Sequence, residues 1–230
     1  MATKSSTARR PVDLLLTCGV VAGPLYAGIA VLEYLFRDGL DIRHHVLSLA
    51  ENGSLGWLQS ANFVITGGLT VAAAVGLRQA LRPGRGSTWG PRLIGVYGAG
   101  LVAAGLFRAD PAEGFPPGTP TGPPGSVSWH GLVHLACASL AFIALIVACF
   151  VLARRFGAAG LRGWRTYSIV TAVLLLLAQI ALSAAPGPVV NVVYVVVALH
   201  ASIWVTAVSA LLRKNAHAVQ VDSGERSQTT

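Results

Sequence analysis

The chain has 230 residues, of which 53% are hydrophobic and only 11% are charged, and its mean hydropathy is +0.63. An ordinary soluble domain carries roughly 25% charged residues, so this composition indicates an integral membrane protein and excludes a soluble domain. The net charge of +8 does not indicate nucleic-acid binding. The cations lie in short segments between apolar runs, and no aromatic-rich basic domain accompanies them.

Six apolar runs follow one another along the chain. They cover approximately residues 14–36, 57–81, 93–107, 129–153, 164–185 and 189–212. A helix of about 20 apolar residues crosses the hydrocarbon core of a bilayer. Runs such as TAVLLLLAQIALSAA lack the polar face that a helix in a soluble bundle needs. We therefore predict an all-α, polytopic membrane protein whose six transmembrane helices form one bundle over residues 13–212.

The distribution of Lys and Arg predicts the orientation of this bundle. All but three of the 17 Lys and Arg residues lie on one side of the predicted topology, the exceptions being Arg37, Arg43 and Arg108. Short cytoplasmic loops are enriched in these residues, so both termini are predicted to be cytoplasmic and loops 37–56 and 108–128 to lie outside. The Gly-, Ala- and Arg-rich composition is typical of a high-GC bacterium. With the apolar runs, we expect a multi-pass protein of the bacterial plasma (inner) membrane.

Two polar tails flank the predicted membrane domain. Residues 1–12 form a short N-terminal tail, and residues 213–230 carry no apolar periodicity. A segment without such periodicity cannot bury enough apolar surface to fold by itself. Both tails are predicted to be cytoplasmic, and the C-terminal tail to be disordered.

Small residues recur at every fourth position in the first three predicted spans. They are Gly19, Gly23 and Ala27, then Gly68, Ala72 and Gly76, then Gly95, Ala99 and Ala103. This spacing lets helix backbones approach closely, so we expect these spans to pack tightly and a leucine at Gly68 or Gly76 to weaken the bundle. The abundance of Gly and Ala accounts for the pattern equally well. Both interpretations stay open, as does a homo-oligomer.

Ionisable residues gather on the predicted outer side, around the end of the third span. Pro111 removes a backbone donor, so the helix should end near Asp110. The segment GFPPGTPTGPPG that follows is expected to be an extended, mobile connector. The next span opens with WHGLVH, which places His130 and His134 on one helix face with Cβ atoms about 5–6 Å apart. His134 would lie inside the membrane, where an ionisable side chain indicates a function by default.

Several interpretations of the histidines stay open. The pair could form only structural hydrogen bonds, or it could bind zinc together with Asp110, because two histidines four residues apart and an aspartate are a usable ligand set. His200, halfway along the sixth span, could ligate haem together with His134. The neighbouring His44 and His45 are expected to be solvated, and Glu33 to extend toward the membrane interface.

Three segments resemble a known family. The first is GLDIRHHVLSLAENGSLGWLQSANFVITG, the second is GLFRADP and the third is WHGLVH. Together they resemble the bacterial membrane proteins catalogued as domain-of-unknown-function family 998, over about residues 13–212. The resemblance implies a six-span bundle. It implies no activity, substrate or catalytic residue.

Two functional classes follow, and the sequence leaves open whether the protein is an enzyme. The favoured one is a noncatalytic binding or sensing module with an outer polar site for a lipid or small apolar ligand, which makes membrane lipids the expected partners. The candidate ligand-binding residues are Asp41, Ser48, Trp57, Asp110, Trp129, His130, His134 and His200. The alternative is a metal-dependent intramembrane hydrolase that uses Asp110, His130 and His134 as zinc ligands. A transporter is disfavoured, because no paired broken helices accompany Gly23-Pro24.

Overall fold

A computed structural model describes the backbone of residues 3–228 and the side chains of residues 11–216. Within this range the chain forms six α-helices and one short 3₁₀ helix. They are α1 (Thr3–Phe36), the 3₁₀ helix η1 (Leu47–Glu51), α2 (Gly56–Ala80), α3 (Trp89–Leu106), α4 (Trp129–Ala158), α5 (Arg162–Ala184) and α6 (Pro188–Gln228). The disorder predicted for residues 213–230 falls mostly outside the side chains that are described, and it stays a prediction.

Five of these helices are long and apolar enough to cross a membrane. They are α1 from Pro11 onward, α2, α4, α5, and α6 as far as Ala216. Helix α3 is not among them, because its 18 residues open with Trp-Gly-Pro-Arg and include further glycines. The all-α fold and the multi-helix membrane character predicted from the sequence are therefore confirmed.

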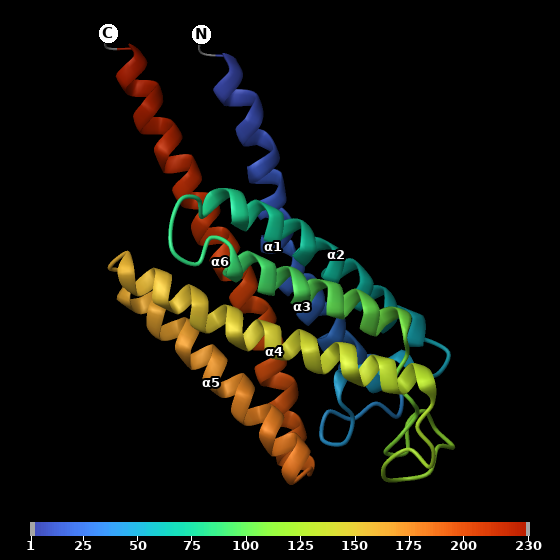
Figure 1. The fold of residues 1–230 in the computed structure, drawn as a ribbon. Coiled ribbons are helices and arrows are strands. Elements are labelled where there is room, and N and C mark those ends of the chain that lie inside the picture. Colours follow the sequence, from blue (N-terminus) through green and yellow to red (C-terminus); the bar gives the residue numbers. More distant parts are fainter. Residues whose placement is uncertain (1–2, 229–230) are drawn as a thin grey trace.

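The helices run up and down, and each one packs against the next in the chain (Figure 1). Helix α6 returns to lie against α1, so the first and last helices are neighbours. Both ends of the chain emerge at one end of the bundle, and the long loops after α1 and α3 lie at the other (Figure 1). We call these the terminal end and the loop end. The α2–α3 and α4–α5 connections lie at the terminal end, and the α5–α6 turn lies at the loop end (Figure 1).

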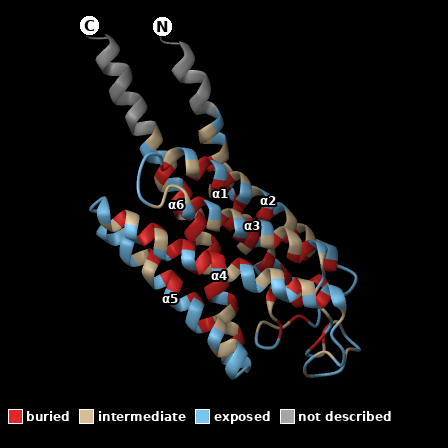
Figure 2. Ribbon diagram, viewed as in Figure 1, coloured by how far each residue is buried: buried red, intermediate tan, exposed pale blue. Residues whose placement is uncertain are grey.

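The outer surface of the bundle is largely apolar. Buried residues face the interior of the bundle, while the outward faces of α4 and α5 are exposed (Figure 2). The exposed side chains include Leu132, Ile143 and Leu177, whereas Trp204 and Leu145 are fully buried. A soluble monomer rarely exposes a contiguous apolar surface of this kind. The surface is the one expected of helices that face lipid.

Glycine lets α1, α2 and α3 approach one another closely, but only some of the predicted positions are involved. A Cβ atom on Gly76 would lie 2.8 Å from Leu15 Cβ of α1. A Cβ atom on Gly67 would lie 2.5 Å from the Gly98 carbonyl oxygen, and one on Gly98 would lie 2.8 Å from the Gly67 oxygen. Nothing lies within 4 Å of the position that a Cβ on Gly68 would take. The expectation of a close crossing is confirmed for Gly76 and is wrong for Gly68.

The two long loops at the loop end pack on each other. Their small apolar core is formed by Leu40, Leu49, Ala50, Ala112 and Phe115. Phe115 belongs to the proline- and glycine-rich segment and is only 2% exposed. The Glu113 and Gly114 N–H groups donate to the carbonyl oxygens of Gly122 and Pro120. The prediction of an extended connector is therefore wrong for the first half of this segment. That half folds back because burial of the Phe115 side chain in the apolar core is favourable.

A buried ion pair fixes the first of these loops to α1. Arg37 lies 3.0 Å from the Glu33 carboxylate, and both side chains are 6% exposed. The same guanidinium donates to the carbonyl oxygens of Ala50 and Asn52 and lies over the Phe115 ring. Glu33 thus does not extend toward the interface as predicted, because its partner Arg37 draws it inward.

Candidate functional site

The start of α4 is held by side chains from its own first turn and from the end of the preceding loop. The Ser128 N–H donates to Asp110 Oδ2 over 2.8 Å, and Ser128 Oγ accepts a hydrogen bond from the Gly131 N–H. The hydrogen bonds from Ser128 hold the pKa of Asp110 below its usual value. A Cβ atom at position 131 would overlap the Asp110 carboxylate, so this contact requires glycine. Asp110 therefore serves to position α4.

His134 lies one turn further along α4, buried between α4, the end of α3 and η1. Its Nδ1 atom lies 2.8 Å from the Phe107 carbonyl oxygen and 3.1 Å from that of Ala104. Carbonyl oxygens only accept hydrogen bonds, so Nδ1 carries a proton and, in the neutral ring, Nε2 keeps its lone pair. The imidazole of His134 thereby caps carbonyl groups at the C-terminal end of α3.

The same Nδ1 atom lies 3.2 Å from Oε2 of Glu51, whose side chain is fully buried. The Glu51 carboxylate also accepts hydrogen bonds from Ser60 Oγ and from the Ala109 N–H. Burial raises the pKa of Glu51 to about 8, although both of these hydrogen bonds and the charge of Arg108 oppose the rise. At neutral pH the Glu51–His134 pair thus includes a carboxyl group that holds its proton.

An open cavity of about 560 Å³ lies beside this pair at the loop end. Its walls are mostly apolar side chains from the two loops, α4 and the α5–α6 turn, and its polar lining residues include Arg43, His44, Asp110, His134 and Asn191. Asn191 also donates to the Ile42 carbonyl oxygen over 2.8 Å, which ties α6 to the first loop. Ligand pockets in proteins have volumes of about 300–1,000 Å³, so this one is large enough for a small ligand.

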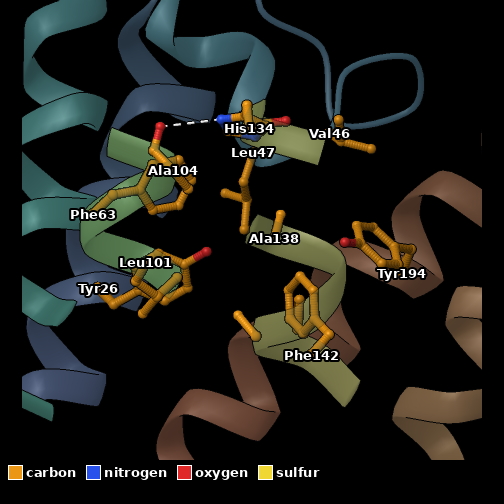
Figure 3. A pocket seen from close by; sticks show the side chains of 13 residues that line it. Tyr26, Val46, Leu47, Phe63, Leu101, Ala104, His134, Ala138, Phe142 and Tyr194 are labelled. Atoms are coloured by element: carbon orange, nitrogen blue, oxygen red, sulfur yellow. Dashed lines mark hydrogen bonds between the residues drawn. The ribbon is translucent and has the colours of Figure 1, made fainter. Parts of the chain in front are cut away.

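A small void of about 50 Å³ lies deeper, between the helices. Its walls include Tyr26, Phe63, Leu101, Phe142 and Tyr194, and His134 lies at its upper edge (Figure 3). Val46, Ser48 and His134 line both this void and the open cavity. These three residues form a wall that the open cavity and the void share.

The structure brings together some of the predicted ligand-binding residues at this cavity and not others. Ser48, Asp110 and His134 line the cavity. Asp41 instead forms an ion pair with Arg43 at 2.7 Å, and the hydrogen bonds from Arg43 lower the pKa of Asp41 to about 2. His44 lines the cavity, while the predicted solvation of His45 is wrong, because its ring is buried between the Asp41 N–H and the Glu113 carbonyl oxygen.

The remaining candidates lie away from the cavity. Trp57 and Trp129 are 58% and 68% exposed at the loop end, as expected of interfacial aromatic residues. His200 lies between α5 and α6, where Nε2 is 3.1 Å from Thr171 Oγ1 and the ring meets the edge of Tyr167. The structure thus does not bring His200 to the site, and it gives no support to haem ligation by His134 with His200.

Asp110, His130 and His134 do not share one centre. The His130 ring is exposed, packs edge-on against Trp129 and has Nδ1 2.7 Å from Ser128 Oγ. The Asp110 carboxylate faces the first turn of α4, and His134 faces Glu51. Among the described residues, no group of three or more His, Cys, Asp or Glu side chains is placed to hold a metal ion. The predicted zinc centre was therefore not found among these residues.

Glu51 is the residue of this site that the sequence did not single out. It follows the short apolar stretch VLSLA and precedes Asn-Gly, a turn signal. An acid at the end of an apolar stretch is a weak indication of burial. Its position against His134 depends on how η1 folds back onto α4, which no local pattern shows.

Comparison with known proteins assigns the chain to a family but to no activity. Neither the curated proteins nor the solved structures include a significant match to the chain. The family described as protein of unknown function, DUF998, matches residues 20–211, which include all six helices in whole or in large part, both loops and the Glu51–His134 pair. The chain therefore belongs to the DUF998 family, as the three sequence segments indicated.

Proposed function

We propose that this protein is a six-span protein of the bacterial plasma membrane, with both termini in the cytoplasm and the loop end outside. Helix α3 packs between α2 and α4 and is about 27 Å long at 1.5 Å per residue, close to the thickness of the hydrocarbon core. Trp57 and Trp129 at the loop end and Trp89 at the terminal end are positioned as interfacial anchors. The bias of Lys and Arg toward the terminal end supports the orientation.

We further propose that the loop end binds a lipid or small amphipathic ligand without catalysing a reaction. The observation that carries this proposal is the wall of Val46, Ser48 and His134, which belongs both to the open cavity and to the apolar void beneath it. A ligand with a polar head in the cavity and an apolar end directed toward the void would match both environments.

Two alanines of α4 provide a matched test. Ala138 lines the void, whereas Ala136, half a turn away, is exposed on the outer face. The thermal shift caused by myristoyl lysophosphatidylethanolamine should be measured on delipidated protein in detergent. Ala138→Phe should fill the void and weaken binding at least about tenfold, or about 1.4 kcal/mol, because the apolar end loses its site. Ala136→Phe should bind as the wild type does.

The melting temperatures without lipid show whether both variants fold. Equal binding by the wild type and both variants would contradict the proposed site, as would the lack of a shift with every single-chain lipid tested. Mass spectrometry of lipids that copurify with the wild type, but not with Ala138→Phe, would identify the natural ligand.

A further inference from the structure

A second open cavity, of about 760 Å³, lies at the terminal end, between the α2–α3 loop and the α4–α5 turn. Four arginines line it, namely Arg85, Arg154, Arg155 and Arg165, together with Trp89. It is at the opposite end of α4 from the Glu51–His134 pair, so it is independent of the function proposed above. We call it the basic cavity.

The basic cavity is built by contacts between the two connections. Arg155 Nη1 donates to the Arg85 carbonyl oxygen over 2.9 Å, which joins the α4 side to the α2–α3 loop. Gly86 has φ +76°, a conformation that favours glycine, and faces Val151 of α4. A Cβ atom on Gly157 would lie 3.0 Å from Arg165 Cδ, so glycine makes room for that side chain. The general enrichment of arginine in cytoplasmic loops accounts for the presence of these residues. That enrichment does not account for a cavity or for the contact between the two connections.

Within residues 11–216, whose side chains the structure describes, no acidic side chain pairs with the four arginines of this cavity. The one acid of that range at the terminal end is Asp13, which lies 2.7 Å from Arg213. Guanidinium groups that converge on one cavity repel each other, and a bound anion would offset that repulsion.

We propose that the basic cavity binds the phosphate group of an anionic phospholipid. Arginine presents a planar set of donors that matches the oxygens of phosphate, and several arginines together are typical of anionic headgroup sites. Trp89, at the rim, is 62% exposed and lies under the Arg92 guanidinium at 5.5 Å, as an aromatic side chain at a membrane interface does. The position at the ends of α3 and α4 places the cavity at headgroup level. A lipid is therefore favoured over free phosphate.

Binding can be measured on delipidated protein as the rise in melting temperature with added lipid. Dimyristoyl phosphatidylglycerol is the anionic probe, and phosphatidylcholine with the same chains is the zwitterionic control. Inorganic phosphate and glycerol 3-phosphate, added without lipid, test for a soluble ligand. We expect phosphatidylglycerol alone to stabilise the wild type at low concentration, with an effect that weakens at high salt.

The variants Arg154→Gln and Arg165→Gln remove charge from the cavity without removing a hydrogen bond to the backbone that the structure shows. Each should raise the half-saturating concentration of phosphatidylglycerol about fivefold, the contribution expected of one basic side chain near an anionic surface. Arg162→Gln is the matched control, because Arg162 is exposed in the same turn and does not line the cavity. The melting temperature without lipid reports whether each variant is folded.

Three results would overturn the proposal. One is an equal effect of phosphatidylcholine and phosphatidylglycerol, and another is an equal loss in Arg162→Gln and the cavity variants. The third is stabilisation by inorganic phosphate without any by phosphatidylglycerol, which would identify a soluble ligand.

Discussion

Glu51 is a carboxylic acid kept away from water at the loop end of the bundle. Its pKa is about 8, well above the usual 4.5 of a glutamate, because burial disfavours the charged form. The groups that face it are His134 of α4, Ser60 of α2 and the Ala109 N–H, with the charges of Arg108 and Glu33 further away. The folded protein therefore retains a proton at Glu51 at pH values where the unfolded chain has released it.

This difference predicts that the contribution of Glu51 to stability falls as pH rises. Between about pH 4.5 and pH 8 Glu51 binds its proton more often in the folded protein than in the unfolded chain, so its contribution to the free energy of unfolding should decrease with pH by at most about 1.4 kcal/mol per unit. Below this window Glu51 is protonated in both states, and above it the loss is complete. Denaturant unfolding in detergent across the pH range measures the slope.

Two variants separate Glu51 from the other acids. Glu51→Gln should flatten the slope within the window, whereas Asp38→Asn, which changes an exposed acid of the same loop, should leave it as in the wild type. An identical slope in the wild type and Glu51→Gln would show that Glu51 does not control the pH dependence.

At the scale of helices, the crossing of α2 and α3 depends on Gly67 and Gly98. The carbonyl oxygen of each glycine faces the Cα atom of the other. Neighbouring Gly68 faces away from this crossing, with open space around it. Gly67→Ala should destabilise the bundle by about 1–3 kcal/mol, because the new methyl group forces the backbones apart. Gly68→Ala should be neutral or stabilising by up to about 1 kcal/mol, since alanine is the better helix former. SDS-titrated unfolding measures both, and equal effects would refute the assigned crossing.

The helices themselves were largely predictable, because apolar runs bounded by Pro, Gly and Arg leave few alternatives in a membrane protein. Which face of each helix lies inside was not predictable where both faces are apolar, so Gly68 and Gly67 could not be distinguished. The folding of the loop after α3 was missed for a different reason. The aromatic side chain of Phe115 in this loop is buried against residues of another loop far away in the sequence.

At the scale of the whole molecule, the ends of the bundle differ in charge and in structure. Cationic side chains gather at the terminal end, and most of the acids lie at the loop end. The candidate site could be predicted in part, since Asp110, Ser48 and His134 were named from the sequence and lie at the cavity. Glu51 and the basic cavity could not, because each arises from two connections that meet only in the folded bundle.

The proposed topology can be tested with two positions that flank α3. In a variant whose three cysteines are replaced by alanine, Ser87→Cys lies in the α2–α3 loop and Thr121→Cys in the loop before α4. An impermeant maleimide should label Thr121→Cys in intact cells and Ser87→Cys only after permeabilisation, because α3 separates them. Labelling of both in intact cells, or of Ser87→Cys alone, would contradict the six-span arrangement.

The low apolarity of α3 has a consequence for how the protein is made. Each glycine that brings α3 close to α2 also lowers the tendency of α3 to pass from water into lipid. The residues that allow close packing therefore make α3 less able to insert into the bilayer by itself. In the proposed topology α3 therefore enters the bilayer as the second half of a helical hairpin with α2, shielded by its neighbour before it meets lipid. The order of synthesis suits this route, because α2 leaves the ribosome first and already presents Gly67 to the helix that follows.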